Sequence, residues 1–197
     1  MCIEFIYRHI RQLPSTQIVT TRELLIYGRR SAVDVALHRL VKSGFIVRLA
    51  RGVFVRDISN PPTMLEIVTA KAKAFKTQIT THAETILHKL NISSSDSDQK
   101  FARNGHSSSF LTIHGRAYLQ GICGRKLALS TCRVGEIIYA LWHFGSGRCS
   151  TDDISQATKT FGRNERNLLW LASSLMPAWL NEICRHRYPL TKIRLRI

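Results

Sequence analysis

The stretch SAVDVALHRLVKSGFIVRLARGVF, residues 31–54, decides how the first part of this chain folds. Its apolar residues recur at intervals of three and four, which predicts an amphipathic helix that Ser31 caps and Gly44 ends. The buried stripe of that helix is expected to be Val33, Ala36, Leu37, Leu40 and Val41. Beyond it, residues 45–49 alternate apolar and polar, residues 50–52 form a turn, and residues 53–55 form a second strand.

The residues before this stretch predict two further helices. Cys2–Leu13 carries an apolar stripe and is stopped by Pro14. After a short extended piece at residues 18–19, Thr20 or Thr21 caps a helix that runs to Tyr27, and Gly28 ends it in a left-handed conformation. Helix, short strand, helix, turn, helix and basic hairpin is the element order of a winged helix-turn-helix. We therefore expect such a DNA-binding domain over residues 1–60.

The polar side of the predicted 31–43 helix suits duplex DNA. If the apolar stripe packs inward, this side faces outward and fits the major groove, where Arg and Lys donate to guanine. We expect groove contacts from Ser31, His38, Arg39 and Lys42, with Asp34 and Val35 on the same face. The candidate phosphate contacts are Arg29, Arg30, Arg48 and Arg51, with Arg56 at the end of the hairpin. The alternative is a winged-helix fold used for protein contacts, its arginines only solvating the surface.

Composition agrees with a polyanionic partner. Among 197 residues, 29 Lys and Arg oppose 13 Asp and Glu, for a formal charge of +16. A membrane span and a secretory signal are not expected, so we expect a cytoplasmic protein. The five cysteines are odd in number and show no Cys-x-x-Cys spacing, which indicates free thiols; they are Cys2, Cys123, Cys132, Cys149 and Cys184.

The rest of the chain predicts a mixed α+β C-terminal domain over residues 61–197. Asn60-Pro61-Pro62 is the candidate linker, and Ser93–Ser109 is the candidate mobile loop. Strands are expected at 110–113 and 126–130, and helices at 64–75, 133–144, 164–176 and 178–187. The C-terminal bases form a dense cluster without an acid; they are Arg185, Arg187, Lys192, Arg194 and Arg196.

The string from Ala32 to Phe54 resembles the winged-helix segment of AbiEi-type antitoxins, with Phe54 where tyrosine is commoner. The likeness continues at residues 81–92, at the strand pair 110–132 with Thr112 and Gly115 in a Thr-x-x-Gly turn, and at residues 135–144 and 177–180. The resemblance implies a repressor that binds inverted repeats in its own promoter. It also implies a C-terminal domain that counters a nucleotidyltransferase-like toxin without a stable complex. The Ser93–Ser109 stretch is longer and more polar than the family pattern.

Catalytic and cofactor motifs are not found in the sequence, so we expect no enzyme, cofactor or metal. Cys184 and His186 would point to different faces of a helix. Thr151, with Asp152 and Asp153, is explained as the N-terminal capping signal of a helix. The scattered histidines and Trp142, Trp170 and Trp179 are interpreted as packing or surface residues. Two alternatives stay open: a regulator whose C-terminal domain senses a ligand or partner, and an enzyme that processes nucleic acid.

Overall fold

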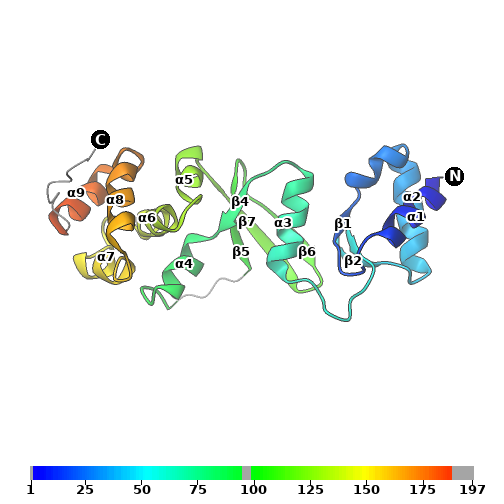
Figure 1. Ribbon diagram of the computed structural model, residues 1–197, viewed down its shortest axis with the longest axis horizontal. Coiled ribbons are helices and arrows are strands. Elements are labelled where there is room, and N and C mark those ends of the chain that lie inside the picture. Colours follow the sequence, from blue (N-terminus) through cyan, green and yellow to red (C-terminus); the bar gives the residue numbers. More distant parts are fainter. Residues whose placement is uncertain (1, 95–98, 188–197) are drawn as a thin grey trace. The chain divides into compact units, whose positions relative to one another are not determined.

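The computed structural model describes residues 2–94 and 99–187 and has a mixed α+β fold (Figure 1). Its contacts divide the chain into two compact units. Unit 1 holds the described residues of Met1–Ile79 and Ser107–Leu119, and unit 2 holds those of Thr80–His106 and Gln120–Ile197. The end of the basic tail (Lys192, Arg194, Arg196) lies outside the described residues.

Unit 1 begins with the order of elements that the sequence predicts. They are α1 (Cys2–Gln12), β1 (Val19–Thr20), the 3-10 helix η1 (Glu23–Tyr27), α2 (Arg30–Lys42), β2 (Val47–Ala50) and β3 (Val53–Val55). The predicted stripe of α2 is correct for Val33, Ala36, Leu37 and Leu40, which are buried, whereas Val41 is half-buried. These residues share one core with Ile6 and Ile10 of α1, Val19 and Phe54. The two helices are held together by this apolar contact.

Three predicted helix ends are wrong in detail. The N-cap of η1 is Arg22, without a side-chain cap, and not Thr20 or Thr21. Arg29, with the extended backbone of an N-cap residue, precedes α2, so Ser31 lies inside the first turn and does not cap it. No side chain caps this end of α2. Gly28 has a φ of 161°, which is extended and not left-handed. Gly44, by contrast, ends α2 with a φ of 71°, as predicted.

The strands of unit 1 pair in the order β1-β3-β2-β6-β7. β1 is antiparallel to β3 with Val19 opposite Phe54, and β2 and β3 form the predicted hairpin. β6 (Ser108–Thr112) and β7 (Gly115–Ile122) form a second hairpin, at whose turn Thr112 Oγ1 donates to the Gly115 carbonyl oxygen at 2.9 Å.

The border of unit 1 lies beyond the boundary expected at residue 60. α3 (Met64–Ala74) and the β6-β7 hairpin belong to it, because Leu49, Val53 and Val55 form a core with Ile67 and Phe110. The expected linker is packed as well, since Pro62 is buried and its carbonyl oxygen lies 2.6 Å from His114 Nε2. The contact between Pro62 and His114 joins residues 52 positions apart, which local composition does not reveal.

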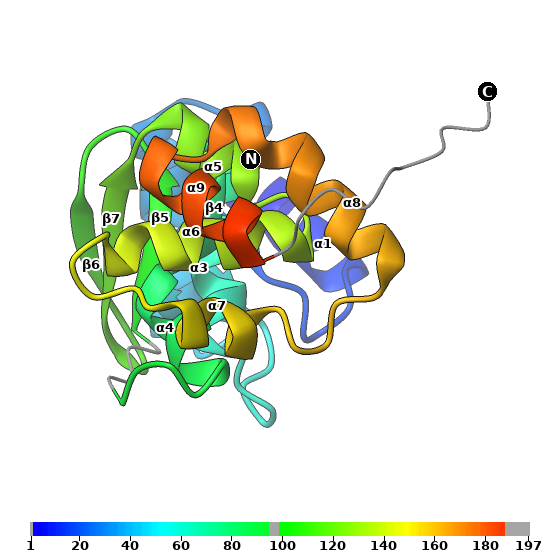
Figure 2. The same cartoon turned by 90° about the vertical axis from the view of Figure 1, so that its left-hand side faces the viewer.

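Unit 2 is mostly helical (Figure 2). α6 (Arg133–Phe144) packs against α4 (Ala83–Lys89), α5 (Gly124–Leu129) and α8 (Arg163–Leu171). The remaining elements are β4 (Ile79–Thr81), β5 (Lys100–Asn104), α7 (Thr151–Ala157), η2 (Ala172–Leu175) and α9 (Ala178–Arg187). The core is centred on the buried face of α6 and includes Ile137, Ile138, Leu141, Ile154 and Leu180.

Several predictions for the later part of the chain need correction. The expected Ser93–Ser109 loop contains β5 and the start of β6, and its residues 95–98 lie outside the described residues. The expected strand at 126–130 is helical in α5, because a short alternating run of apolar residues does not distinguish the two states. Ser150, not Thr151, caps α7, in a capping box with Asp153.

Candidate nucleic-acid interface

α2 presents a polar face to solvent along its whole length. All six side chains of the predicted face are exposed; they are Ser31, Asp34, Val35, His38, Arg39 and Lys42. They lie opposite the buried apolar stripe, because the helical period separates the two sets. Val35 is the apolar member of this face and is 52% exposed. The face therefore offers two cations, an imidazole, a hydroxyl, a carboxylate and an isopropyl group in reach of one partner.

Arg30 and Asp34 form an ion pair on the first turns of α2. Arg30 Nε donates to Asp34 Oδ2 at 2.8 Å, and both side chains are more than half exposed. Such an exposed pair adds little stability, about 0.3–0.5 kcal/mol. Its main effect is to hold the Arg30 guanidinium along the helix. Within the described residues, Arg29, Arg39 and Lys42 have no ion pair.

The β2-β3 hairpin carries two of the predicted phosphate contacts. Arg48 and Arg51 are exposed, and Gly52 takes a left-handed φ of 77° at the turn. Arg56 does not belong with them. Its guanidinium donates to the carbonyl oxygens of Arg11 at 2.8 Å and Ile10 at 3.5 Å, so it closes the C-terminal end of α1.

Two basic residues that the sequence reasoning missed lie beside the hairpin turn. Lys71 of α3 donates from Nζ to the carbonyl oxygen of Arg51 at 3.1 Å and lies 4.0 Å from the ring centroid of Phe110. Burial lowers the pKa of Lys71, and the charges of Arg51 and Arg48 lower it further. The guanidinium of Arg22 lies 4.5 Å from the ring centroid of Phe75. No local signal links these residues to the hairpin, because they meet only through the tertiary fold.

None of the protein-family models matches this chain. A search of curated proteins also finds no match. None of the helices in the described ranges is long and apolar enough to cross a membrane.

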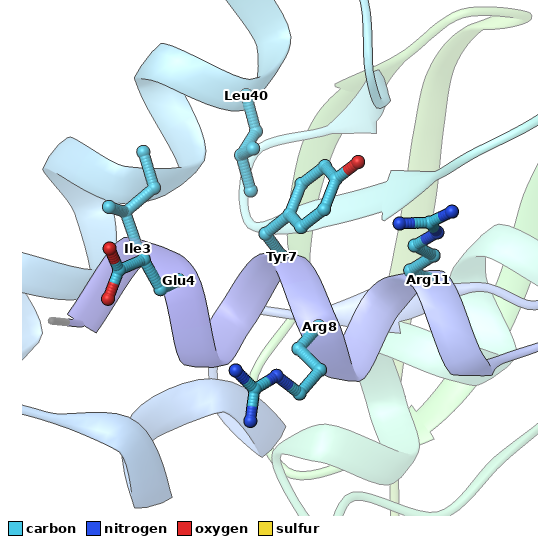
Figure 3. A pocket seen from close by; sticks show the side chains of 6 residues that line it. All are labelled: Ile3, Glu4, Tyr7, Arg8, Arg11 and Leu40. Atoms are coloured by element: carbon cyan, nitrogen blue, oxygen red, sulfur yellow. The ribbon is translucent and has the colours of Figure 1, made fainter.

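A cavity of about 510 Å³ lies on the surface of α1 (Figure 3). Its apolar part is lined by Ile3 and Tyr7 of α1 and by Leu40 of α2, and Tyr7 projects toward Leu40. Glu4, Arg8 and Arg11 supply its charged groups, and Arg8 points away from Leu40. The described residues of this lining thus combine a small apolar patch with one carboxylate and two guanidinium groups.

Unit 2 contains a cluster of histidines that the sequence did not predict. His82 is buried, and its ring meets that of His143 edge to face, with 5.1 Å between the centroids. His82 also contacts the side-chain oxygen of Gln120 through Nε2 and accepts a hydrogen bond from the Glu84 backbone nitrogen at Nδ1. Glu84 lies 4.0 Å from His143 and 2.7 Å from Lys100. Burial lowers the pKa of His143, and the neighbouring His82 adds to that effect.

The other candidate reactive residues do not form a site. Burial raises the pKa of the Cys184 thiol to about 12, whereas His186 is exposed. Asp153 is engaged in the cap of α7. Trp142 and Trp179 pack against the core of unit 2, as predicted, and the half-buried Trp170 lies on α8. Among the described residues, no group of three or more His, Cys, Asp or Glu side chains is arranged to hold a metal ion.

Proposed function

We propose that the first part of the chain is a winged helix-turn-helix that binds double-stranded DNA with α2 in the major groove. The observation that carries this proposal is the exposed face of α2 opposite a wholly apolar buried stripe. On that face, Arg39 and Lys42 can donate to guanine O6 and N7, and Val35 can contact a thymine methyl group. Asp34 can accept from cytosine N4 and would oppose non-specific approach to phosphates.

The arrangement of the neighbouring elements supports the same proposal. η1 and α2 are joined by the short segment around Gly28 and Arg29, as in a helix-turn-helix. β1 pairs with β3 and β3 with β2, so the strand between the helices lies beside the hairpin in the sheet of unit 1. The exposed Arg48 and Arg51 of this hairpin suit backbone phosphates, which set register and make binding depend on salt.

We further propose that the protein represses its own operon at inverted repeats and acts as the antitoxin of a nucleotidyltransferase-like toxin. This part is supported by the resemblance of residues 32–54 to AbiEi-type antitoxins. Residues 61–197 would then act against the toxin without a stable complex. We expect a toxin gene beside this one. Co-expression of this chain is expected to relieve the growth arrest that the toxin causes. The absence of such a neighbouring gene, or a growth arrest that this chain does not relieve, would favour a regulator whose C-terminal part senses a ligand or partner.

The experiment that tests DNA binding is a titration on the DNA upstream of the gene and on an unrelated duplex of equal length. Measurements at several salt concentrations separate specific from purely ionic binding. We expect a preference of about a thousandfold or more for the upstream DNA. Equal, salt-sensitive binding to both duplexes would contradict the proposal.

A pair of variants assigns the groove contact. Arg39→Ala is expected to weaken binding to the upstream DNA by about tenfold or more and to reduce the preference. Lys159→Ala is the matched control, because it removes an equal charge from an exposed position in unit 2. If both variants bind the upstream DNA as wild type does, α2 is not the helix that contacts the bases.

A further inference from the structure

A second cavity of unit 1, of about 260 Å³, lies between the hairpin turn and the end of α3. Its walls include Thr21, Arg22, Arg30, Arg51, Lys71 and Phe75. Four of these side chains are basic, and no Asp or Glu among the described residues lines the cavity. Arg22 and Arg30 are near each other in the sequence, but Arg51 and Lys71 are each about twenty residues further along, so the fold itself gathers the charge.

The positive charge of this cavity is largely unbalanced. Arg30 is paired with Asp34, but Arg22, Arg51 and Lys71 have no ion pair within the described residues. The nearby carboxylate of Glu23 accepts from the backbone nitrogen of Thr20 at 3.0 Å and does not line the cavity. Three like charges around one small space repel one another, so a bound anion would lower the energy of the folded protein.

The basic groups are also held in place. Arg22 stacks on Phe75 and donates to the carbonyl oxygen of Ala74 at 3.4 Å. Lys71 is half-buried and fixed by its bond to the Arg51 carbonyl oxygen, and the lowered pKa of its amine reflects burial beside Arg51 and Arg48. A fixed, partly desolvated cation binds an anion more strongly than a freely hydrated one.

We propose that this cavity binds a phosphate group, held by Arg22, Arg51 and Lys71. The phosphate can come from the backbone of bound DNA, in which case the inference rests on the proposed function and extends the interface to α3. It can also come from a free phosphorylated small molecule. Either source uses the same charge-assisted hydrogen bonds from guanidinium and ammonium groups.

The test compares Lys71→Gln with Lys73→Gln, an exposed lysine of the same helix that does not line the cavity. DNA affinity is measured against salt on both the upstream and the unrelated duplex. If the phosphate belongs to DNA, Lys71→Gln lowers the slope of log K against log salt by about one on both duplexes, and Lys73→Gln leaves it unchanged. Lys71→Arg should restore the slope.

The second arm uses inorganic phosphate, titrated at constant ionic strength and followed by the NMR amide signals of Thr21 and Gly52. Saturable shifts in wild type and Lys73→Gln, lost in Lys71→Gln, support the cavity. When these shifts occur without any difference in the DNA slopes, the source is a free phosphorylated molecule. If Lys71→Gln matches Lys73→Gln in both arms, the inference is overturned.

The two proposals fail in different ways. If the wild-type protein shows no preference for the upstream DNA, the proposed function is wrong. The salt slopes measured on the unrelated duplex and the NMR shifts caused by phosphate still test whether the cavity binds phosphate. Should Lys71→Gln not fold, Arg22→Gln tests the same cavity through another of its cations. The expected outcomes for that variant are the same.

Discussion

Gly135, in the first turn of α6, packs directly on the carbonyl group of Leu129 at the end of α5. A β-carbon at Gly135 would lie 1.8 Å from the Leu129 oxygen, so no other residue fits without moving the backbone. We expect Gly135→Ala to lower the free energy of unfolding by about 3 kcal/mol or more, as overpacked sites do. Urea unfolding followed by circular dichroism measures the change.

Gly124 provides the control for this substitution. It begins α5, and a β-carbon there meets no atom within 4 Å. Gly124→Ala should therefore leave stability unchanged or raise it by up to about 1 kcal/mol, because alanine restricts the unfolded chain. Equal stability of the two variants would contradict the close packing of α5 and α6.

The second prediction concerns Arg56, whose guanidinium closes the end of α1. Arg56→Ala leaves the Arg11 carbonyl oxygen without its donor, and we expect it to destabilise the protein by about 1–2 kcal/mol. The slope of DNA affinity against salt should stay at the wild-type value. Arg51→Ala is expected to reduce the slope of DNA affinity against salt and to leave the free energy of unfolding nearly unchanged. A reduced slope for Arg56→Ala would place this arginine at the DNA.

The third prediction concerns thiol reactivity. Burial raises the pKa of Cys149 to about 11 and of Cys184 to about 12, whereas Cys123 and Cys132 are exposed. Iodoacetamide at pH 8 should label Cys123 and Cys132 within minutes and spare the two buried thiols until urea unfolds the chain. Peptide mass mapping assigns each site. Early labelling of Cys184 would show that the core of unit 2 opens readily.

The fourth prediction concerns pH. The pKa of His143 is lowered in the folded protein, chiefly by burial, so the unfolded chain binds its proton more readily. Stability that is present above the ordinary histidine pKa, about 6.5, is then lost as the pH falls below it. The lowered pKa of Glu84, held by its hydrogen bond from Lys100, continues this loss toward still lower pH.

Substitution of His143 isolates its share of the pH dependence. His143→Gln should flatten the fall in unfolding free energy between pH 7 and pH 5.5, measured in urea. His88→Gln, at an exposed position of α4, should keep the wild-type pH dependence. A wild-type stability that does not change over this range would contradict the assignment.

The local periodicity of residues 31–44 was enough to predict α2 and its exposed face, because a strong apolar stripe and a left-handed glycine are encoded within these fourteen positions. Helix starts were less predictable: Ser31 is a good capping residue, yet Arg29 occupies that position. The short alternation at 126–130 fits a strand or a helix equally well, and the contact with α6 decides between them. Residue patterns did not predict Lys71 beside Arg51, since twenty residues separate them.

The hairpin turn is held from both sides, because Thr21 donates to the Gly52 carbonyl oxygen at 3.0 Å and Lys71 donates to that of Arg51. A turn fixed in this way has already lost most of its conformational entropy when the protein folds. A flexible loop would lose that entropy only on meeting its target, at a cost of about 0.5–1.5 kcal/mol for each side chain that becomes ordered. The β2-β3 turn is therefore preorganised, and binding of a polyanion there would require no disorder-to-order transition of the turn.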